Sequence, residues 1–125
     1  MCPISLRSYK QNVTYLSDGD VERLHDELLR FKLATYQYKA PANASATHLG
    51  FIIDDVGQSP AVDSTGQRVD LYAYTSMAVA ALQQQAREIA ELKRQVTVLE
   101  QQLKGAHQET REPQRLGAAA SDPSR

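Results

Sequence analysis

The sequence predicts an α+β fold: small antiparallel β-strands with one packed helix, followed by a long C-terminal helix that forms a parallel coiled coil. Three observations lead to this prediction. Apolar residues recur at helical spacing from Val21 onward, and two segments rich in β-forming residues follow. Residues 82–103 then contain no Gly or Pro and repeat apolar residues three and four apart. The expected parts are an N-terminal arm (1–16), a small head (17–73), a coiled-coil helix (74–104) and a disordered tail (105–125).

The long helix carries a narrow apolar stripe, here called the seam. Leu82, Ile89, Val96 and Leu103 occupy heptad position a, and Leu92 and Leu99 occupy position d, where Gln85 is the polar exception. A stripe of this width fits another copy of the same helix better than a globular core. The helix would be about 33 Å long at ~1.5 Å per residue. The alternative is a surface helix that folds back on its own domain.

Composition narrows the classes of partner. The 125 residues, 42% of them hydrophobic, suit one small domain with extensions. A net charge of −1 gives no support for a nucleic-acid partner. No apolar run approaches the roughly 20 residues that span a bilayer, and no signal peptide is recognisable, so we expect a soluble chain with no membrane partner. The single cysteine, Cys2, excludes an internal disulfide framework, and we expect neither a cofactor nor a metal site.

The first helix is expected from about residue 20 to 32. Asp18 or Asp20 can cap its first backbone N–H groups and complement the positive end of the helix dipole. His25 lies beside the apolar stripe and is expected on the helix surface. The stripe itself, which should be buried, consists of Val21, Leu24, Leu28 and Phe31.

Two strands and a hairpin are expected next. Residues 34–39 alternate with period two, and residues 48–56 should form the central strand. Within that strand we expect Phe51, Ile52 and Ile53 in the core. Residues 61–71 indicate a short hairpin that turns at Gly66, and Gly105 should end the long helix as a C-cap. Asp54 and Asp55 fit a cation or acid–base site, but solvated acids at a strand end are commoner.

Several short motifs occur in a characteristic order along the chain. Together they resemble the C-terminal intramolecular chaperone domain of phage tail spikes and endosialidases, the S74 peptidase family, from about Ser5 to Lys104. In the family, a serine is followed five residues later by a lysine and then by an asparagine and an aliphatic residue. The matching residues are Ser5, Lys10, Asn12 and Val13, then Tyr36–Lys39, Gly50–Val56 with Pro60, Gly66, and Val69–Leu71.

The resemblance implies a trimer that holds a preceding fibre or spike stem in register and is then cut from it. Ser5 would be the nucleophile and Lys10 the general base, because a lysine kept neutral by burial can take the serine proton. The acidic residue that usually follows the serine is Leu6 here. Only four residues precede Ser5 in this sequence, so cleavage would release about four residues. The alternative for Ser5 and Lys10 is an ordinary polar arm.

The heptads alone do not determine how many helices form the coiled coil. Ile89 and Val96 at position a, with leucines at position d, favour two parallel strands, whereas Leu82 and Leu103 blur this preference. The resemblance implies three strands. Flanking charges that can pair between parallel chains are Glu88 and Lys93.

Three functions are compatible with these observations. The first is an assembly module whose partners are its own copies in a homotrimer and an N-terminal client stem. The second is an autocatalytic serine endopeptidase that acts once on its own chain. The third is a non-catalytic coiled-coil oligomerisation or adaptor module. For the first two, the resemblance implies a virion-associated protein, or one released after cleavage in the host cytoplasm.

Overall fold

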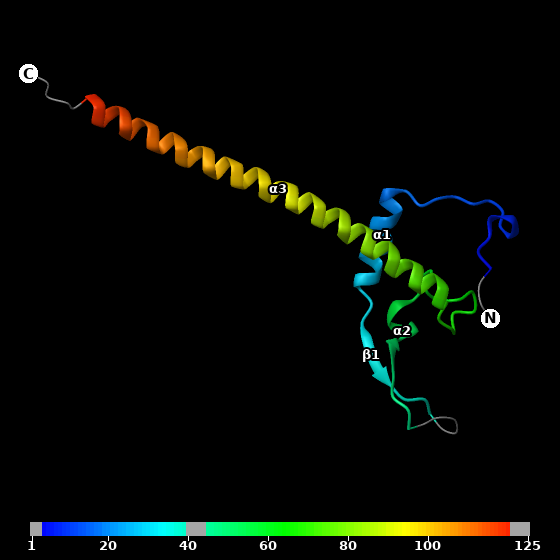
Figure 1. Ribbon diagram of the computed structural model, residues 1–125. Coiled ribbons are helices and arrows are strands. Elements are labelled where there is room, and N and C mark those ends of the chain that lie inside the picture. The colour runs from blue at the N-terminus through cyan, green and yellow to red at the C-terminus, as the bar shows by residue number, and fades with distance from the viewer. Residues whose placement is uncertain (1–3, 40–44, 121–125) are drawn as a thin grey trace, which may run out of the picture. The chain divides into compact units, whose positions relative to one another are not determined.

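The computed structural model describes residues 4–39 and 45–120, with side chains described as far as residue 109. It confirms an α+β fold with a two-stranded antiparallel sheet and a long C-terminal helix (Figure 1). The chain divides into two compact units, residues 1–85 (the head unit) and residues 86–125. The elements are η1 (Arg7–Tyr9), α1 (Asp18–Leu29), β1 (Leu33–Tyr36), β2 (His48–Phe51), α2 (Ile53–Val56) and α3 (Leu71–Ala120).

Helix α1 begins with a capping box. The Ser17 hydroxyl accepts a hydrogen bond from the backbone N–H of Asp20 (3.1 Å), and the Asp20 carboxylate accepts one from the backbone N–H of Ser17 (2.9 Å). The N-cap is therefore Ser17 and not Asp18 or Asp20, but Asp20 belongs to the capping box and both aspartates lie in the first turn, where they complement the helix dipole as expected. These bonds lower the pKa of Asp20, because they favour its charged form.

One face of α1 packs on the core as expected. Val21 is buried, and Leu24 and Leu28 pack against the core cluster. Phe31 also packs there, but it follows the helix, which ends at Leu29 and not near residue 32 as predicted. The prediction of a surface position for His25 is wrong, since its side chain is buried and its Nδ1 lies 2.9 Å from the Asp26 carboxylate. His25 follows Val21 by four residues, so it lies on the same face of the helix.

The two strands are shorter than predicted. They pair antiparallel from Leu33↔Phe51 to Tyr36↔His48. The central strand does not continue to Val56, because residues 53–56 form the single turn of α2. Gly57 ends this turn with a φ of 73°, and its N–H bonds to the Ile53 carbonyl. Asp54 and Asp55 have low β-propensity and complement the positive start of α2.

The predicted hairpin is present. Val62 bridges Val69, and the N–H of Asp63 bonds to the Arg68 carbonyl (2.8 Å). Gly66 adopts a φ of 73° in the turn. Directly after the hairpin, the Asp70 carboxylate accepts a hydrogen bond from the backbone N–H of Ala73 (2.9 Å), which caps the start of α3.

The core is small and lies where the first turns of α3 meet the other elements of the head unit (Figure 1). Its buried members are Phe51, Ala61 and Met77. The rings of Phe31, Phe51 and Tyr74 pack together, with centroids 4.8 to 6.0 Å apart. Phe51 is thus a core residue as predicted, whereas Ile52 and Ile53 are only partly buried.

Helix α3 is longer than the sequence indicates. It begins at Leu71 and continues through Gly105 to Ala120, so the prediction that Gly105 ends the helix is wrong. A glycine costs a helix only about 1 kcal/mol relative to alanine, and this cost does not end α3. Residues 121–125 of the expected tail, and residues 40–44 of the loop after β1, lie outside the described residues. Within residues 4–39 and 45–120, no helix is long and apolar enough to cross a membrane.

Candidate functional site

The N-terminal arm brings Ser5 and Lys10 into contact. The Lys10 Nζ donates a hydrogen bond to the Ser5 Oγ over 2.9 Å. Between them, the 3-10 turn η1 folds the chain back, since the N–H groups of Tyr9 and Lys10 bond to the carbonyls of Leu6 and Arg7. The contact is local in origin, because one tight turn is enough to return residue i+5 to residue i.

Two further features shape the arm. Asn12 has a φ of 54°, a left-handed conformation that asparagine adopts more readily than most residues. The Arg7 Nη2 donates a hydrogen bond to the Tyr15 hydroxyl over 2.6 Å, so the two sides of this turn are tied together. Asn12 is one of the motif residues, and the structure gives it a backbone role in reversing the chain after Lys10.

The Ser5 hydroxyl also approaches α3. Its Oγ lies 3.5 Å from the Tyr72 hydroxyl, at the outer limit of a hydrogen bond. The sequence analysis did not identify Tyr72 as a neighbour of Ser5. No sequence pattern could have found it, because 67 residues separate it from Ser5.

The arrangement supplies two of the parts that Ser–Lys chemistry needs. A serine hydroxyl bonded to a lysine amine can lose its proton to that amine when the lysine is neutral. In the single chain, however, Ser5, Lys10 and Tyr72 are all exposed. The single chain therefore does not provide the burial that keeps a catalytic lysine neutral.

The seam is the second candidate site. All six of its apolar side chains are exposed in the single chain, with exposed fractions from 52% to 66%. They occupy heptad positions a and d of α3, and on another face of the helix Glu91 bonds to side chains one turn further along. The Glu91 carboxylate accepts hydrogen bonds from Arg94 (2.6 and 3.0 Å) and Gln95 (3.0 Å), which lower the pKa of Glu91 to about 2.

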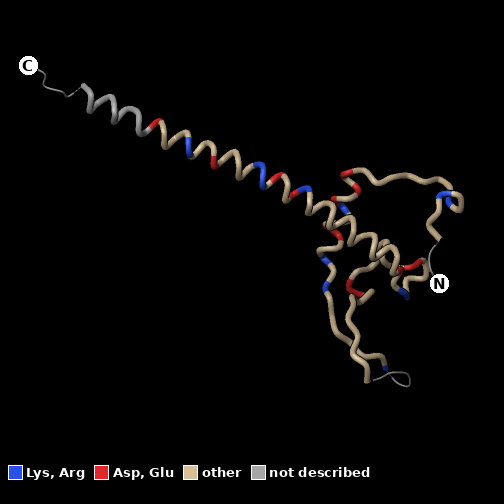
Figure 2. Tube along the Cα trace, in the orientation of Figure 1, with Lys and Arg blue, Asp and Glu red and all other residues tan. Residues whose placement is uncertain are grey.

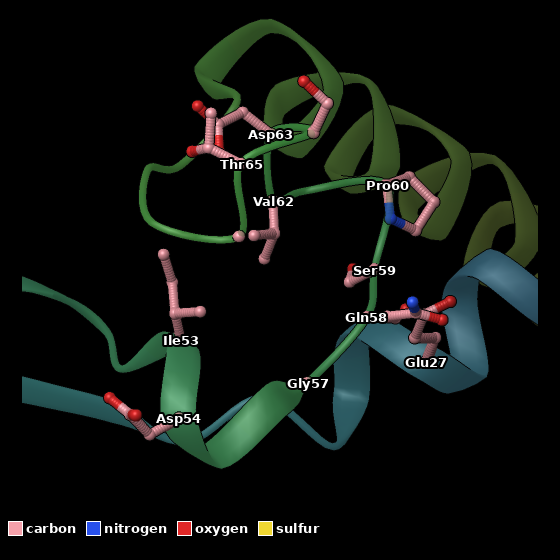
Figure 3. A pocket seen from close by; sticks show the side chains of 12 residues that line it. Glu27, Ile53, Asp54, Gly57, Gln58, Ser59, Pro60, Val62, Asp63 and Thr65 are labelled. Carbon is pink, nitrogen blue, oxygen red and sulfur yellow. The ribbon is translucent and has the colours of Figure 1, made fainter.

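An open hollow of about 910 Å³ lies between α2, the hairpin and α1 (Figure 3). Ile53 and Val62 point into it, and Asp63 lies at its rim beside Thr65. Asp63 serves the hairpin turn: bonds from the Thr65 hydroxyl and the N–H groups of Arg68 and Gln67 lower its pKa. In the part of the chain that the structure describes, no three His, Cys, Asp or Glu side chains converge to hold a metal ion.

No family model matches the chain, and no curated protein matches it either. The resemblance to the chaperone family therefore stands on the motifs alone. Residues of two of those motifs make defined contacts in the fold: Ser5 bonds to Lys10, and Asp70 caps the start of α3. Cys2 lies outside the described residues.

Proposed function

We propose that this chain is a C-terminal intramolecular chaperone domain that trimerises through the seam and assists assembly of a preceding fibre or spike stem. The observation that carries this proposal is the exposure of the seam. Six large apolar side chains in heptad register are exposed on α3, and between Leu82 and Leu103 the remaining residues are mostly polar. Such a face is covered most simply by copies of itself, in a parallel coiled coil.

Trimerisation gives a chaperone its physical advantage. Three client chains joined to one coiled coil have their ends held together, so each meets the others at a high effective concentration. Association through the seam would offset the entropy lost when three stem ends are brought into register, before the stem itself has folded.

We further propose that Ser5 and Lys10 release the client after assembly. The Ser5 Oγ would give its proton to the Lys10 Nζ and attack the carbonyl carbon of Ile4, so that an ester forms as the Ile4–Ser5 amide bond breaks and the Ser5 nitrogen takes up the proton from Lys10. Water would then hydrolyse this ester, which frees the preceding segment with a carboxylate end and restores the serine hydroxyl. The 2.9 Å contact between the two side chains supports this assignment.

Two measurements test the proposal. Sedimentation equilibrium at micromolar concentration should give three times the mass of the chain, and a monomer would exclude the assembly function. For cleavage, a folded reporter protein is joined ahead of Ile4, and the products are identified by mass spectrometry. A cut next to Ser5 is expected.

Ser5→Ala and Lys10→Arg are the matched variants for the cleavage test. Ser5→Ala removes the nucleophile, and Lys10→Arg keeps the charge but lacks a nitrogen that can act as a base near neutral pH. Both should stay uncut while remaining trimeric. A wild-type fusion that stays as intact as the Ser5→Ala fusion would leave the trimeric module without its peptidase activity.

A further inference from the structure

The first four turns of α3 lack charged residues entirely. From Leu71 to Ala86 the helix contains only apolar, hydroxyl and amide side chains, and its first charge is Arg87. Figure 2 shows this stretch without blue or red, in contrast to the charges that follow along the helix. A helix without charges on any face is normally covered on all of its faces.

The head unit covers only one face of this stretch. Met77, Ala80 and Ala81 are buried against the core. On other faces, large apolar side chains remain open, and the most exposed are Leu71 and Leu82. The face of this uncharged stretch that carries Leu71 and Leu82 is therefore not covered within the single chain.

Heptad register indicates what covers it. Counting back seven residues from Leu82 places Thr75 at position a, and counting back from Gln85 places Ala78 and then Leu71 at position d. Tyr72 and Val79 occupy the adjoining position e, and both are exposed. The exposed face of α3 in the head unit therefore has the same heptad register as the seam.

An apolar groove adjoins this face. Leu28, Leu29, Phe31 and Leu33 line one side of it and Thr75 and Ala78 the other, with a volume of about 500 Å³. None of the side chains that line it is charged. Leu29 and Leu33 are 62% and 61% exposed, so the groove opens to solvent in the single chain.

We propose that this groove holds the exposed α3 face of a second copy, so that the contact between copies starts in the head unit and not at Leu82. Thr75 and Ala78 are small for coiled-coil positions a and d, which leaves space at their level for side chains such as Tyr72 and Val79 of the next copy. Both surfaces are uncharged, so their contact buries no unpaired charge. This inference rests on the proposed self-association of the chain and names the part of the head that joins it.

A pair of neighbouring substitutions tests the groove. Thr75 and Ser76 are both exposed, and each hydroxyl bonds to the carbonyl four residues earlier (2.7 and 2.9 Å). Thr75→Lys places a charge at position a, whereas Ser76→Lys places it at position b, away from the groove. Thr75→Lys should weaken association measured by sedimentation at least about tenfold, and Ser76→Lys less than about twofold. Equal effects would contradict the proposal, provided circular dichroism shows both variants folded.

Photo-crosslinking separates this inference from the proposed function. Benzoylphenylalanine is placed in the full chain at Leu29 in the groove, at Leu99 in the seam, or at Arg23 on another exposed part of α1. Crosslinks between copies are expected from Leu29 and Leu99 but not from Arg23, with the Leu29 product mapping to residues 71–82. A crosslink from Leu99 alone, or from Leu29 to another segment, would overturn the groove contact and leave the seam standing. No crosslink from either position would overturn self-association itself.

Discussion

The head core and the seam are built from similar apolar side chains but differ in what covers them. Phe51 and Met77 are covered by elements of their own chain, and Phe51 is only 6% exposed. Leu92 and Leu99 project from a helix with more than half of each side chain exposed. The comparison shows that the apolar side chains of the core are removed from water when the chain folds, whereas those of the seam are not.

The difference between the two regions indicates how the proposed association would affect stability. A small unit buries a smaller fraction of its surface than a large one, so its stability is marginal. The buried core of the head unit centres on three residues, while its arm leaves Ile4, Leu6 and Tyr9 exposed. We therefore expect stability to rise with protein concentration, as it does for obligate oligomers.

The largest expected effect is the loss of association when the seam alone is disrupted. Leu92→Asp together with Leu99→Asp places carboxylates where leucines should meet, so association should weaken by more than about 100-fold. Sedimentation velocity measures the change. Thr97→Asp together with Gln101→Asp adds the same charges at positions b and f and should leave the oligomer intact. If the seam variant kept its oligomeric state, the coiled coil would have to be discarded as the cause of association.

A substitution in the core alone should have the next largest effect, on the free energy of unfolding. Phe51→Ala removes a ring that packs on Phe31 and Tyr74, and it should lower the free energy of unfolding by about 3–5 kcal/mol. Leu49→Ala, two residues earlier on β2, changes a side chain that is 71% exposed and should cost less than about 0.5 kcal/mol. Urea unfolding of both variants gives the comparison, and similar losses would contradict the assignment of the core.

The capping box offers a smaller effect confined to the head unit. Ser17→Ala removes the hydroxyl that bonds to the Asp20 N–H, and it should lower the free energy of unfolding by about 1 kcal/mol. Ser17→Asp retains an acceptor at the N-cap and should recover most of this loss. Both values come from urea unfolding, and an Ala variant as stable as the wild type would show that the box contributes nothing.

The smallest effect is a pH dependence of α3. Because the pKa of Glu91 is lowered from 4.5 to about 2, its charged form stabilises the folded helix fully above pH 4.5. This contribution should fade as the pH falls from 4.5 towards 2, when the carboxylate takes up a proton. Helix content followed by circular dichroism should fall less over this range in Glu91→Gln than in the wild type. Identical curves would show that the Glu91–Arg94 pair is not formed in solution.

Local patterns account for most of the correct predictions. The helical stripe from Val21 and the hairpin turn at Gly66 depend on periodicity and turn chemistry within a few residues. The contact between Ser5 and Lys10 is also local, since it needs only one turn of chain, but the pair was identified through the resemblance and not through a local pattern. Their chemical role stays a prediction, because the resemblance supplied it and the geometry only permits it.

The wrong predictions involve competition between local preferences and the rest of the fold. Residues 48–56 are hydrophobic enough for one strand, yet the chain turns into α2 at Ile53, where two aspartates and Gly57 favour a helical turn. His25 is polar by type but is buried because it follows Val21 by one helical turn. Gly105 is a good helix terminator in isolation, but the helix continues through it.

The sequence by itself determined the seam, because a heptad is a repeating local pattern that needs no knowledge of other elements. Only the tertiary structure decided which face of the uncharged stretch of α3 is buried, since that depends on where Phe51 and Met77 meet in space. It also placed Tyr72 beside Ser5 and opened a groove next to Thr75. Contacts between residues this far apart in the chain arise from packing, and periodicity carries no information about them.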